Sequence, residues 1–416
     1  MAHIEDRWYK TVVVDDRNVQ VPKATHGKGM RYRVRYIGPD GRERSESFPD
    51  RRKRDASAFL AQVQADILKG TYVDPDAGRV TFRRYADEWL AAASCDESTR
   101  ERLERQFRLH VHPVFGDRPI AAVQPNTIRA WAKQLQGSGM AARYRRNLFN
   151  DVSMILNAAV DDRKVISNPC ALKTVRAPRY VPAKVVPWST ERLASFRAVM
   201  RERYRIAVDL GAGCGLRQGE IFAVSPDDVD TSRRLLHVVR QIKIVRGTLV
   251  FAPPKGGKLR EVPLPDAVAA RLREPAAQVD PVPVTLPWGT PDGEPRTVTV
   301  YLSTANGDPL SRPSFNANVW KPAIRAAGVE DTRQNGMHVL RHTYASVLLD
   351  AGENIKAPSL YLGHADPGFT LRVYTHLLPT SEDRTRRAID TAFGHGPTTP
   401  DGLAGCRNGV RTAQAG

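Results

Sequence analysis

The stretch YLGHADPGFTLRVYTH, residues 361–376, places His364 ten residues before Tyr374. Pro367 and Gly368 lie between them, and both residue types interrupt helices, so we expect the histidine and the tyrosine to lie on separate segments. Most tyrosines in a chain of 416 residues pack or face solvent. The pair therefore has chemical meaning only if other parts of the chain supply partners for it.

The composition points to a polyanionic partner. Lysine and arginine total 63 against 45 aspartates and glutamates, a formal net charge of +18, which favours nucleic acid first and a membrane surface second. No apolar run is long enough for a transmembrane helix, and the polar start MAHIEDRWYK lacks a signal-peptide core. The four cysteines are widely separated and form no zinc spacing, which fits a reduced, cytosolic protein.

The N-terminal segment predicts a small sheet packed on one helix. In RYRVRY, residues 31–36, arginines alternate with tyrosine and valine, so the two kinds of residue occupy opposite faces of a strand. GPDG then predicts a turn to a second strand, and the apolar spacing predicts a helix from an Asp55 cap to about Gly70. The arginine face is either a DNA-binding surface or simply solvated; its residues are Arg31, Arg33 and Arg35.

Residues 80–170 predict an all-α bundle. One helix is expected to begin at a Ser98 cap, and the last and longest carries an apolar stripe with arginines at its start. The stripe consists of Leu148, Val152, Ile155, Leu156 and Ala159, and the basic end of Arg143, Arg145 and Arg146. The proline-rich, basic stretch 168–190 predicts an extended linker suited to lie along phosphates.

From about residue 188 a mainly α domain is expected, with a short antiparallel β region at 234–264. The proline-rich residues 274–300 predict a surface excursion, and the polar tail predicts disorder. We thus expect a multidomain chain: a small α+β domain (1–75), an all-α bundle (80–170), a linker (171–187), a mainly α domain (188–394) and a disordered tail (395–416).

AVDLGAGCG, residues 207–215, suggests one possible function. A glycine-rich loop after an apolar segment is typical of S-adenosylmethionine-dependent methyltransferases, with Asp227, Asp228 or Asp230 as the acid that would end the next strand. That fold needs repeated strand–helix units after residue 215, and the sequence shows few. A nucleic-acid methyltransferase therefore remains a remote alternative.

Four segments, in chain order, carry a more specific pattern: GCGLRQGE, FAPPKGGKLREVPLP, GMHVLRHTYASVLL and YLGHADPGFTLRVYTH. Together they resemble the tyrosine recombinase (phage integrase) family over residues 188–393. The helical bundle is similar, less specifically, to the core-binding domain of that family, and the N-terminal segment resembles the arm-binding domains of its integrases. The resemblance implies a site-specific DNA recombinase.

The resemblance assigns site residues by position. The family usually has an aspartate where this chain has Val339, and Lys258 is an alternative to the lysine matched in the β-hairpin. The matched catalytic residues are Arg217, Lys255, His338, Arg341, His364 and the nucleophile Tyr374, with Glu220 supporting Arg217.

The chemistry of these residue types agrees with the assignment. A phosphodiester repels nucleophiles, and arginines can fork N–H donors onto its non-bridging oxygens, where charge grows in the transition state. Tyr374 would attack to give a 3′-phosphotyrosine, which preserves the bond energy so that no ATP, metal or other cofactor is needed. Lys255 would protonate the leaving 5′-oxygen, His338 would accept the phenol proton, and His364 would bind a phosphate oxygen.

His342 lies four residues after His338, the spacing of a zinc-binding helix. Arg341 between them would repel a metal, and no glutamate follows His338, so we interpret His342 as a packed helix residue.

The resemblance also implies partners. We expect double-stranded DNA attachment sites, a homotetramer on DNA, a DNA-bending or directionality protein, no membrane, and a bacterial cytosolic, nucleoid-associated protein that integrates or excises a phage or mobile element. A helix over 380–394 is expected to couple neighbouring subunits. A type IB topoisomerase-like enzyme and a catalytically inactive DNA-binding protein remain alternatives.

Overall fold

A computed structural model describes residues 2–14, 17–74, 76–274, 280–364, 366–374, 386 and 389–393. The chain folds into two compact units, Met1–Pro182 and Ala183–Gly416. Most of the helix expected over 380–394, and the tail expected over 395–416, lie outside the described residues. The division into five parts stays a prediction. No helix in the described part of the chain is long and apolar enough to cross a membrane.

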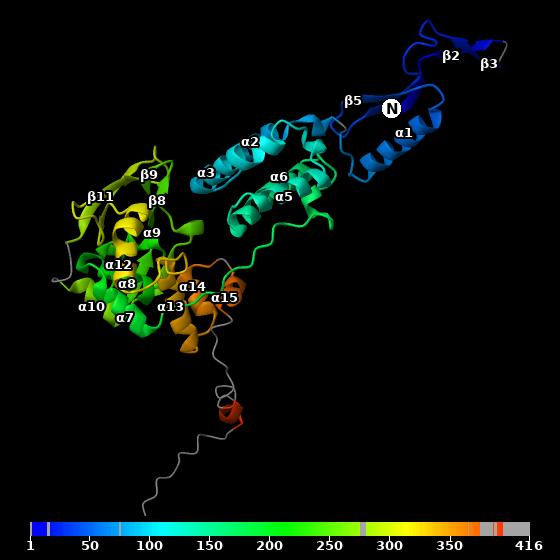
Figure 1. Cartoon of the computed structure of the whole chain (residues 1–416). Helices are drawn as coiled ribbons and strands as arrows, with labels where there is room; N and C mark the ends of the chain where they lie inside the picture. The colour runs from blue at the N-terminus through cyan, green and yellow to red at the C-terminus, as the bar shows by residue number, and fades with distance from the viewer. Residues whose placement is uncertain are drawn as a thin grey trace, which may run out of the picture. The chain divides into compact units, whose positions relative to one another are not determined.

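The first unit begins with the predicted sheet and helix (Figure 1). The antiparallel sheet has the order β1-β4-β5 and packs on α1, with Tyr32, Val34 and Tyr36 buried on the helix side as predicted. Asp55 is not the cap, because α1 begins before it. A separate hairpin, β2–β3, was not foreseen. The bounds are β1 (His3–Asp6), β2 (Tyr9–Val14), β3 (Arg17–Pro22), β4 (Tyr32–Ile37), β5 (Glu43–Phe48) and α1 (Lys53–Leu68).

The helical bundle follows in the same unit. The predicted apolar stripe of its longest helix, α6, is fully buried against the other helices. Asp96, rather than Ser98, caps α3 by accepting the Ser98 backbone N–H. The bounds are α2 (Phe82–Ala92), α3 (Glu97–Gln106), a π-helical turn (Phe107–Val111), α4 (His112–Phe115), α5 (Pro125–Gly137) and α6 (Ala142–Asp161).

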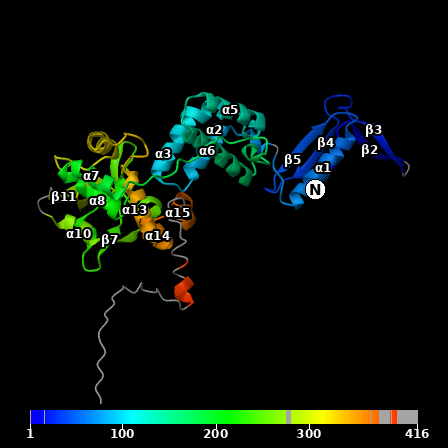
Figure 2. The same ribbon diagram turned by 60° about the horizontal axis from the view of Figure 1, so that its bottom comes forward.

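The second unit is mainly helical around one large apolar core, with α14 and α15 packed in succession after α13 (Figure 2). Its helices are α7 (Thr190–Val199), α8 (Arg205–Gly213), α9 (Gln218–Ile221), α10 (Asp266–Arg273), α11 (Arg312–Phe315), α12 (Lys321–Ala326), α13 (His338–Asp350), α14 (Lys356–Leu362) and α15 (Pro367–Tyr374).

Three small antiparallel sheets complete the second unit: β10-β7-β6, β8-β9 and β11-β12. The expected surface excursion at 274–300 is wrong for its described part, because β11 and β12 form a hairpin whose Val284, Leu286 and Val300 enter the core. The bounds are β6 (Val229–Asp230), β7 (Leu235–Val238), β8 (Gln241–Val245), β9 (Thr248–Ala252), β10 (Arg260–Pro263), β11 (Val282–Pro287) and β12 (Pro295–Val300).

The glycines of AVDLGAGCG do not form a cofactor loop. Residues 205–213 are the helix α8, so no strand leads into the glycines. A Cβ at Gly211 would lie 2.7 Å from a Leu340 methyl carbon, and one at Gly213 would lie 2.6 Å from a Val268 methyl carbon. The glycines therefore allow α8 to pack closely on α13 and α10, and the methyltransferase interpretation is wrong.

Candidate active site

Arg217 and Glu220 are held together by the start of α9. Arg217 is the N-cap residue of this short helix, and its backbone N–H donates to Glu220 Oε2 at 2.8 Å. Its guanidinium also donates to Glu220 Oε1 at 2.9 Å. The predicted supporting acid is thus in place, and it fixes both the main chain and the side chain of Arg217.

Arg260, which the sequence interpretation missed, is the second partner of Glu220. It lies on β10 and donates two hydrogen bonds to the Glu220 carboxylate, at 3.0 and 2.6 Å. Both side chains are buried, with 3% and 0% of their surface exposed. Burial alone would raise the pKa of Glu220, but the hydrogen bonds and charge of Arg260, with the charge of Arg217, outweigh it and lower the pKa.

The C-terminal end of α14 gathers three arginines. Arg260 donates to the carbonyl of Tyr361 at 2.7 Å, Arg341 to that of Leu362, and Arg217 to that of Gly363 at 3.4 Å. These carbonyls carry the negative end of the helix dipole, which favours nearby cations. Gly363 ends the helix with φ +61°, a left-handed conformation that suits glycine. The predicted pair, Arg217 and Arg341, therefore meet at one place.

Arg341 is almost completely enclosed, with 1% of its surface exposed. It also donates to the carbonyl of Gly215 at 2.7 Å. Burial, and then the positive charge of Arg217, lower the pKa of Arg341 to about 9, which leaves the guanidinium protonated at neutral pH. An anion would compensate for this charge.

Val339, the departure from the family pattern, is 1% exposed and belongs to the apolar core. His338 beside it is exposed at the start of α13. Val339 therefore acts as a packing residue of the apolar core.

Tyr374, the last residue of α15, is 2% exposed and packs in a small apolar cluster with Tyr344 and Leu362. Its hydroxyl lies 2.7 Å from His342 Nδ1. His342, expected to be only a packing residue, therefore touches the candidate nucleophile. The imidazole of His338 lies next to that of His342, with ring centroids 4.6 Å apart and an interplanar angle of 85°.

His364 follows Gly363 and lies on the other side of a helix break. Its Nδ1 is 2.6 Å from the Thr370 hydroxyl, which belongs to α15. His364 and Tyr374 lie on separate segments as predicted, but Pro367 begins α15 and Gly368 lies inside it. The break is made at Gly363, before the proline.

Loss of hydration and nearby positive charge keep the histidines neutral. Burial, and then Arg341, lower the pKa of His342 to about 4, and burial with Arg341 and Arg217 lowers that of His364 to about 3. The pKa of His338 is lowered by the same causes, burial first, although its exposed ring lets water moderate the shift. Burial raises the pKa of Tyr374 to about 12, while Arg341 opposes the shift.

Lys255 and Lys258 lie in one exposed loop between β9 and β10. Gly256 and Gly257, between the lysines, have φ of +77° and +69°. The loop is not a hairpin, as was expected, because β9 and β10 belong to different sheets. Either lysine can extend toward a ligand, and the choice between them stays open.

The three arginines of the N-terminal face differ in their partners. Arg31 pairs with Asp6 and Asp50, and Arg35 with Glu5 and Glu43. Arg33 has a buried Nε without a hydrogen-bond partner. The shared face is as predicted, but acidic side chains on the neighbouring strands and on the loop after β5 neutralise two of its three charges. Within the described residues, Arg33 is the member of this face that has no acidic partner among the ion pairs.

Two of the three arginines at the start of α6 already donate hydrogen bonds within the protein, so they are only partly available to bind an outside phosphate. Arg145 donates to the carbonyl of Gln136 at 3.0 Å, and Arg146 to that of Pro178 at 3.4 Å. Arg143 is exposed, with its guanidinium 6.0 Å from the ring centre of Tyr180. Cations at a helix N-terminus oppose the helix dipole, so a phosphate would relieve both the arginines and the helix.

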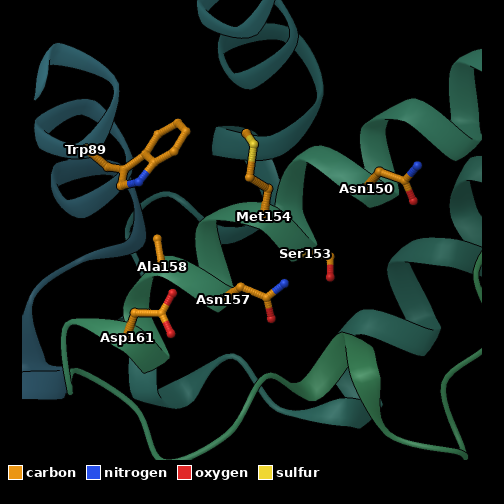
Figure 3. A pocket seen from close by; sticks show the side chains of 7 residues that line it. All are labelled: Trp89, Asn150, Ser153, Met154, Asn157, Ala158 and Asp161. Atoms are coloured by element: carbon orange, nitrogen blue, oxygen red, sulfur yellow. The ribbon is translucent and has the colours of Figure 1, made fainter. Parts of the chain in front are cut away.

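A hollow on the bundle lies between Trp89 of α2 and one side of α6 (Figure 3). Asp161 is the only charged side chain that lines it, so this hollow is unsuited to a phosphate; the other lining residues are Asn150, Ser153, Met154, Asn157 and Ala158.

The second unit thus brings Arg217, Glu220, Arg341, His364 and Tyr374 to one end of α14, with His338 close by. Guanidinium groups beside a tyrosine hydroxyl are suited to bind a phosphate next to a nucleophile. This fold and site define a class of enzymes that transfer phosphodiesters.

Comparisons with known proteins agree with this class of enzyme. Residues 190–380 match the Phage integrase family, and residues 81–136 match the Phage integrase N-terminal SAM-like domain. The integrase of Mycobacterium phage D29 is 27% identical over 86% of this chain and 91% of its own length. A tyrosine recombinase XerC-like protein of Caldanaerobacter subterraneus is 24% identical over 87% and 96%.

Solved structures support the fold. The Tn1549 transposon integrase in complex with transposon right end DNA superposes with a TM-score of 0.63 at 20% identity, over 76% of this chain and all of the other. The chain belongs to the phage integrase family, the tyrosine-type site-specific recombinases. It is an integrase that binds and recombines DNA.

Proposed function

We propose that Tyr374 is the nucleophile of this recombinase and that Arg217 and Arg341 bind the scissile phosphate. The observation that carries the proposal is the convergence of both arginines on the end of α14, in the same cluster of helices that holds the Tyr374 hydroxyl. Donors fixed before the reaction stabilise the charge that develops on the phosphate without reorganising.

In the proposed step, Tyr374 Oη loses its proton to a neighbouring histidine and forms a bond to phosphorus, and the bond from phosphorus to the 5′-oxygen breaks. Lys255 gives the departing oxygen its proton, with Lys258 as the alternative donor. His364, and His338 at the start of α13, add hydrogen bonds to the phosphate oxygens. Attack of another 5′-hydroxyl on the phosphotyrosine reverses these steps and rejoins the strand, so no ATP is consumed.

The test is a nicked suicide substrate that carries the attachment site found beside the element in its host genome. We expect the native protein to form a denaturation-resistant covalent adduct, and Tyr374→Phe to form none. An adduct that persists in the variant would move the nucleophile elsewhere. Sequence-specific binding without an adduct from the native protein would favour the inactive DNA-binding alternative, and relaxation of supercoiled DNA without a specific site would favour the topoisomerase-like one.

We further propose that Arg33 and Arg143 contact the DNA backbone, since Arg33 has an unpartnered Nε beside the ion-paired Arg31 and Arg35, and Arg143 is exposed. Arg31 and Arg35, which pair with acids, then mainly support the surface, while Arg145 and Arg146 bond to neutral oxygens and can add charge toward the same phosphates. Replacing Arg143 by glutamine should weaken binding to all sequences alike and reduce the salt dependence by about one phosphate contact. A loss confined to the attachment site would instead indicate base recognition.

A homotetramer is the assembly that we propose on DNA. Two duplexes have four strands to cut, and each protomer offers one candidate nucleophile, so a complete exchange uses four copies. Residues 383–416 are proposed to couple them, with an accessory DNA-bending or directionality protein setting the direction. Deleting this segment should abolish the joining of two sites in a mobility-shift assay while sparing binding to one. Unchanged recombination would refute the coupling role.

A further inference from the structure

The contact between His342 and Tyr374 joins two helices that are far apart in sequence. His342 lies on α13, and its Nδ1 is 2.7 Å from the hydroxyl oxygen at the end of α15. The rings meet at 61°, with centroids 5.7 Å apart. This is the one hydrogen bond of the Tyr374 hydroxyl within the described residues. The atom that would attack phosphorus is therefore already bound to a group that can take a proton.

The surroundings keep both partners of this hydrogen bond in their neutral forms. Burial and the charge of Arg341 keep His342 neutral at physiological pH, and burial keeps Tyr374 protonated. With the tautomer that carries its proton on Nε2, His342 Nδ1 offers a lone pair, and the Tyr374 hydroxyl donates to it. Within the described residues, the charged or titratable groups around the pair include Arg341, His338 and Tyr344 from α13 and His364 after α14.

We propose that His342 is the general base that takes the proton of Tyr374 during strand cleavage and returns it during rejoining. The proposal rests on the proposed role of Tyr374 as nucleophile. It replaces His338 in that role, because His338 contacts the ring of His342 and has no hydrogen bond to the tyrosine in the described structure. His338 is then available to bind the phosphate.

The Tyr374 O–H bond breaks as its oxygen bonds to phosphorus, and the proton moves to His342 Nδ1, which becomes an imidazolium. The bond from phosphorus to the 5′-oxygen breaks, and that oxygen takes a separate proton from the lysine. In the reverse step the imidazolium protonates the departing phenol oxygen.

The same pair would keep the tyrosine unreactive without DNA. The pKa of Tyr374, about 12, lies far above that of His342, about 4, so the proton stays on the phenol at rest. A phosphate bound beside Arg341 brings negative charge, which raises the pKa of His342 and makes it a better base. Proton transfer is thus favoured only when substrate occupies the site.

The experiment measures single-turnover cleavage of the suicide substrate by the native protein, His342→Asn and His338→Asn. An asparagine can place its amide oxygen near the former Nδ1 and still accept the tyrosine hydrogen bond, but it cannot take up a proton. We expect His342→Asn to lower the cleavage rate on the order of 100-fold or more, the usual contribution of a general base, with DNA affinity unchanged. Val347→Asn, at an exposed position of the same helix, should cleave like the native protein.

A second substrate distinguishes the general acid, the lysine, from the proposed general base, His342. Replacing the bridging 5′-oxygen by sulfur gives a leaving group that needs no proton, so it should restore cleavage by Lys255→Ala, or by Lys258→Ala if that lysine is the acid, but not by His342→Asn. Rescue of His342→Asn by sulfur, or a rate within about threefold of native with the ordinary substrate, would overturn the proposal. If His342→Asn does not fold, His342→Gly with added imidazole takes its place, and failure of imidazole to restore cleavage is the negative result.

The outcomes also separate this inference from the proposed function. If the native protein forms no adduct, or Tyr374→Phe still does, the nucleophile assignment itself fails. If the native adduct depends on Tyr374 while His342→Asn cleaves normally and His338→Asn does not, only the inference is refuted.

Discussion

Replacing Glu220 by glutamine should be among the most damaging changes to the second unit that preserve side-chain shape. Glu220 is buried and accepts hydrogen bonds from the Arg217 backbone and guanidinium and from both terminal nitrogens of Arg260. The amide would keep one acceptor oxygen and turn an NH₂ group toward these donors. Removing one member of a buried ion pair costs about 3–5 kcal/mol, because the other charge stays buried and uncompensated.

For a unit of this size each kcal/mol lowers the unfolding temperature by roughly 2–4 °C, so we expect a decrease of about 6–20 °C. Urea denaturation and calorimetry of the full chain measure the two quantities. Glu261→Gln is the matched control, since Glu261 is the next residue on β10 and its side chain is 49% exposed. Its cost should stay within about 0.5 kcal/mol. A loss below about 1 kcal/mol for Glu220→Gln would refute the reasoning, because a buried charge cannot lose its partner so cheaply.

A double variant tests whether the Glu220–Arg260 pair serves stability, catalysis or both. Glu220→Leu combined with Arg260→Met removes both charges and fills similar volume, so most of the stability should return. Cleavage should remain lost, because Arg217 no longer has the carboxylate that orients it. Recovery of cleavage together with stability would mean that Glu220 has no part in positioning Arg217.

Two further predictions concern the glycine turn and the histidines. Gly215→Ala should lower the free energy of unfolding more than Gly247→Ala. Both glycines have positive φ, but at Gly215 the added Cβ would also lie 2.5 Å from a ring carbon of Tyr344. Equal losses of unfolding free energy for the two variants would contradict this. Stability should also fall as pH decreases from about 6.5 toward 4, because the unfolded chain takes up protons there while His342 and His364, with lowered pKa, do not. Melting temperatures across this range should fall less steeply for His342→Asn, and an equal slope would refute its lowered pKa.

Periodic patterns in the sequence predicted which faces of single strands and helices are buried. The alternation in residues 31–36 gave the buried face of β4, and the apolar spacing gave the buried stripe of α6. Caps were predicted less well, since Asp96 rather than Ser98 caps α3. The hairpin of β11 and β12 was missed because its prolines suggested a loop, although Val284 and Leu286 alternate as a half-buried strand requires.

In the candidate site, too, the sequence predicted only contacts that a local pattern could indicate. Arg260 carried a readable signal, because it alternates with Val262 on the buried face of β10, and an arginine at such a position needs an acid nearby. His342 carried no such signal. Its contact with Tyr374 depends on how α15 packs against α13, which no periodicity in either helix determines.

The arginines at the end of α14 are held by main-chain carbonyls of Tyr361, Leu362 and Gly363. Every residue type supplies a carbonyl, so mutation of the side chains at the first two positions does not remove an acceptor. Substitutions of these side chains that preserve α14 would therefore leave the acceptors of the arginines in place. Gly363 is constrained by its left-handed backbone, and Leu362 by the burial of its side chain in the cluster with Tyr374.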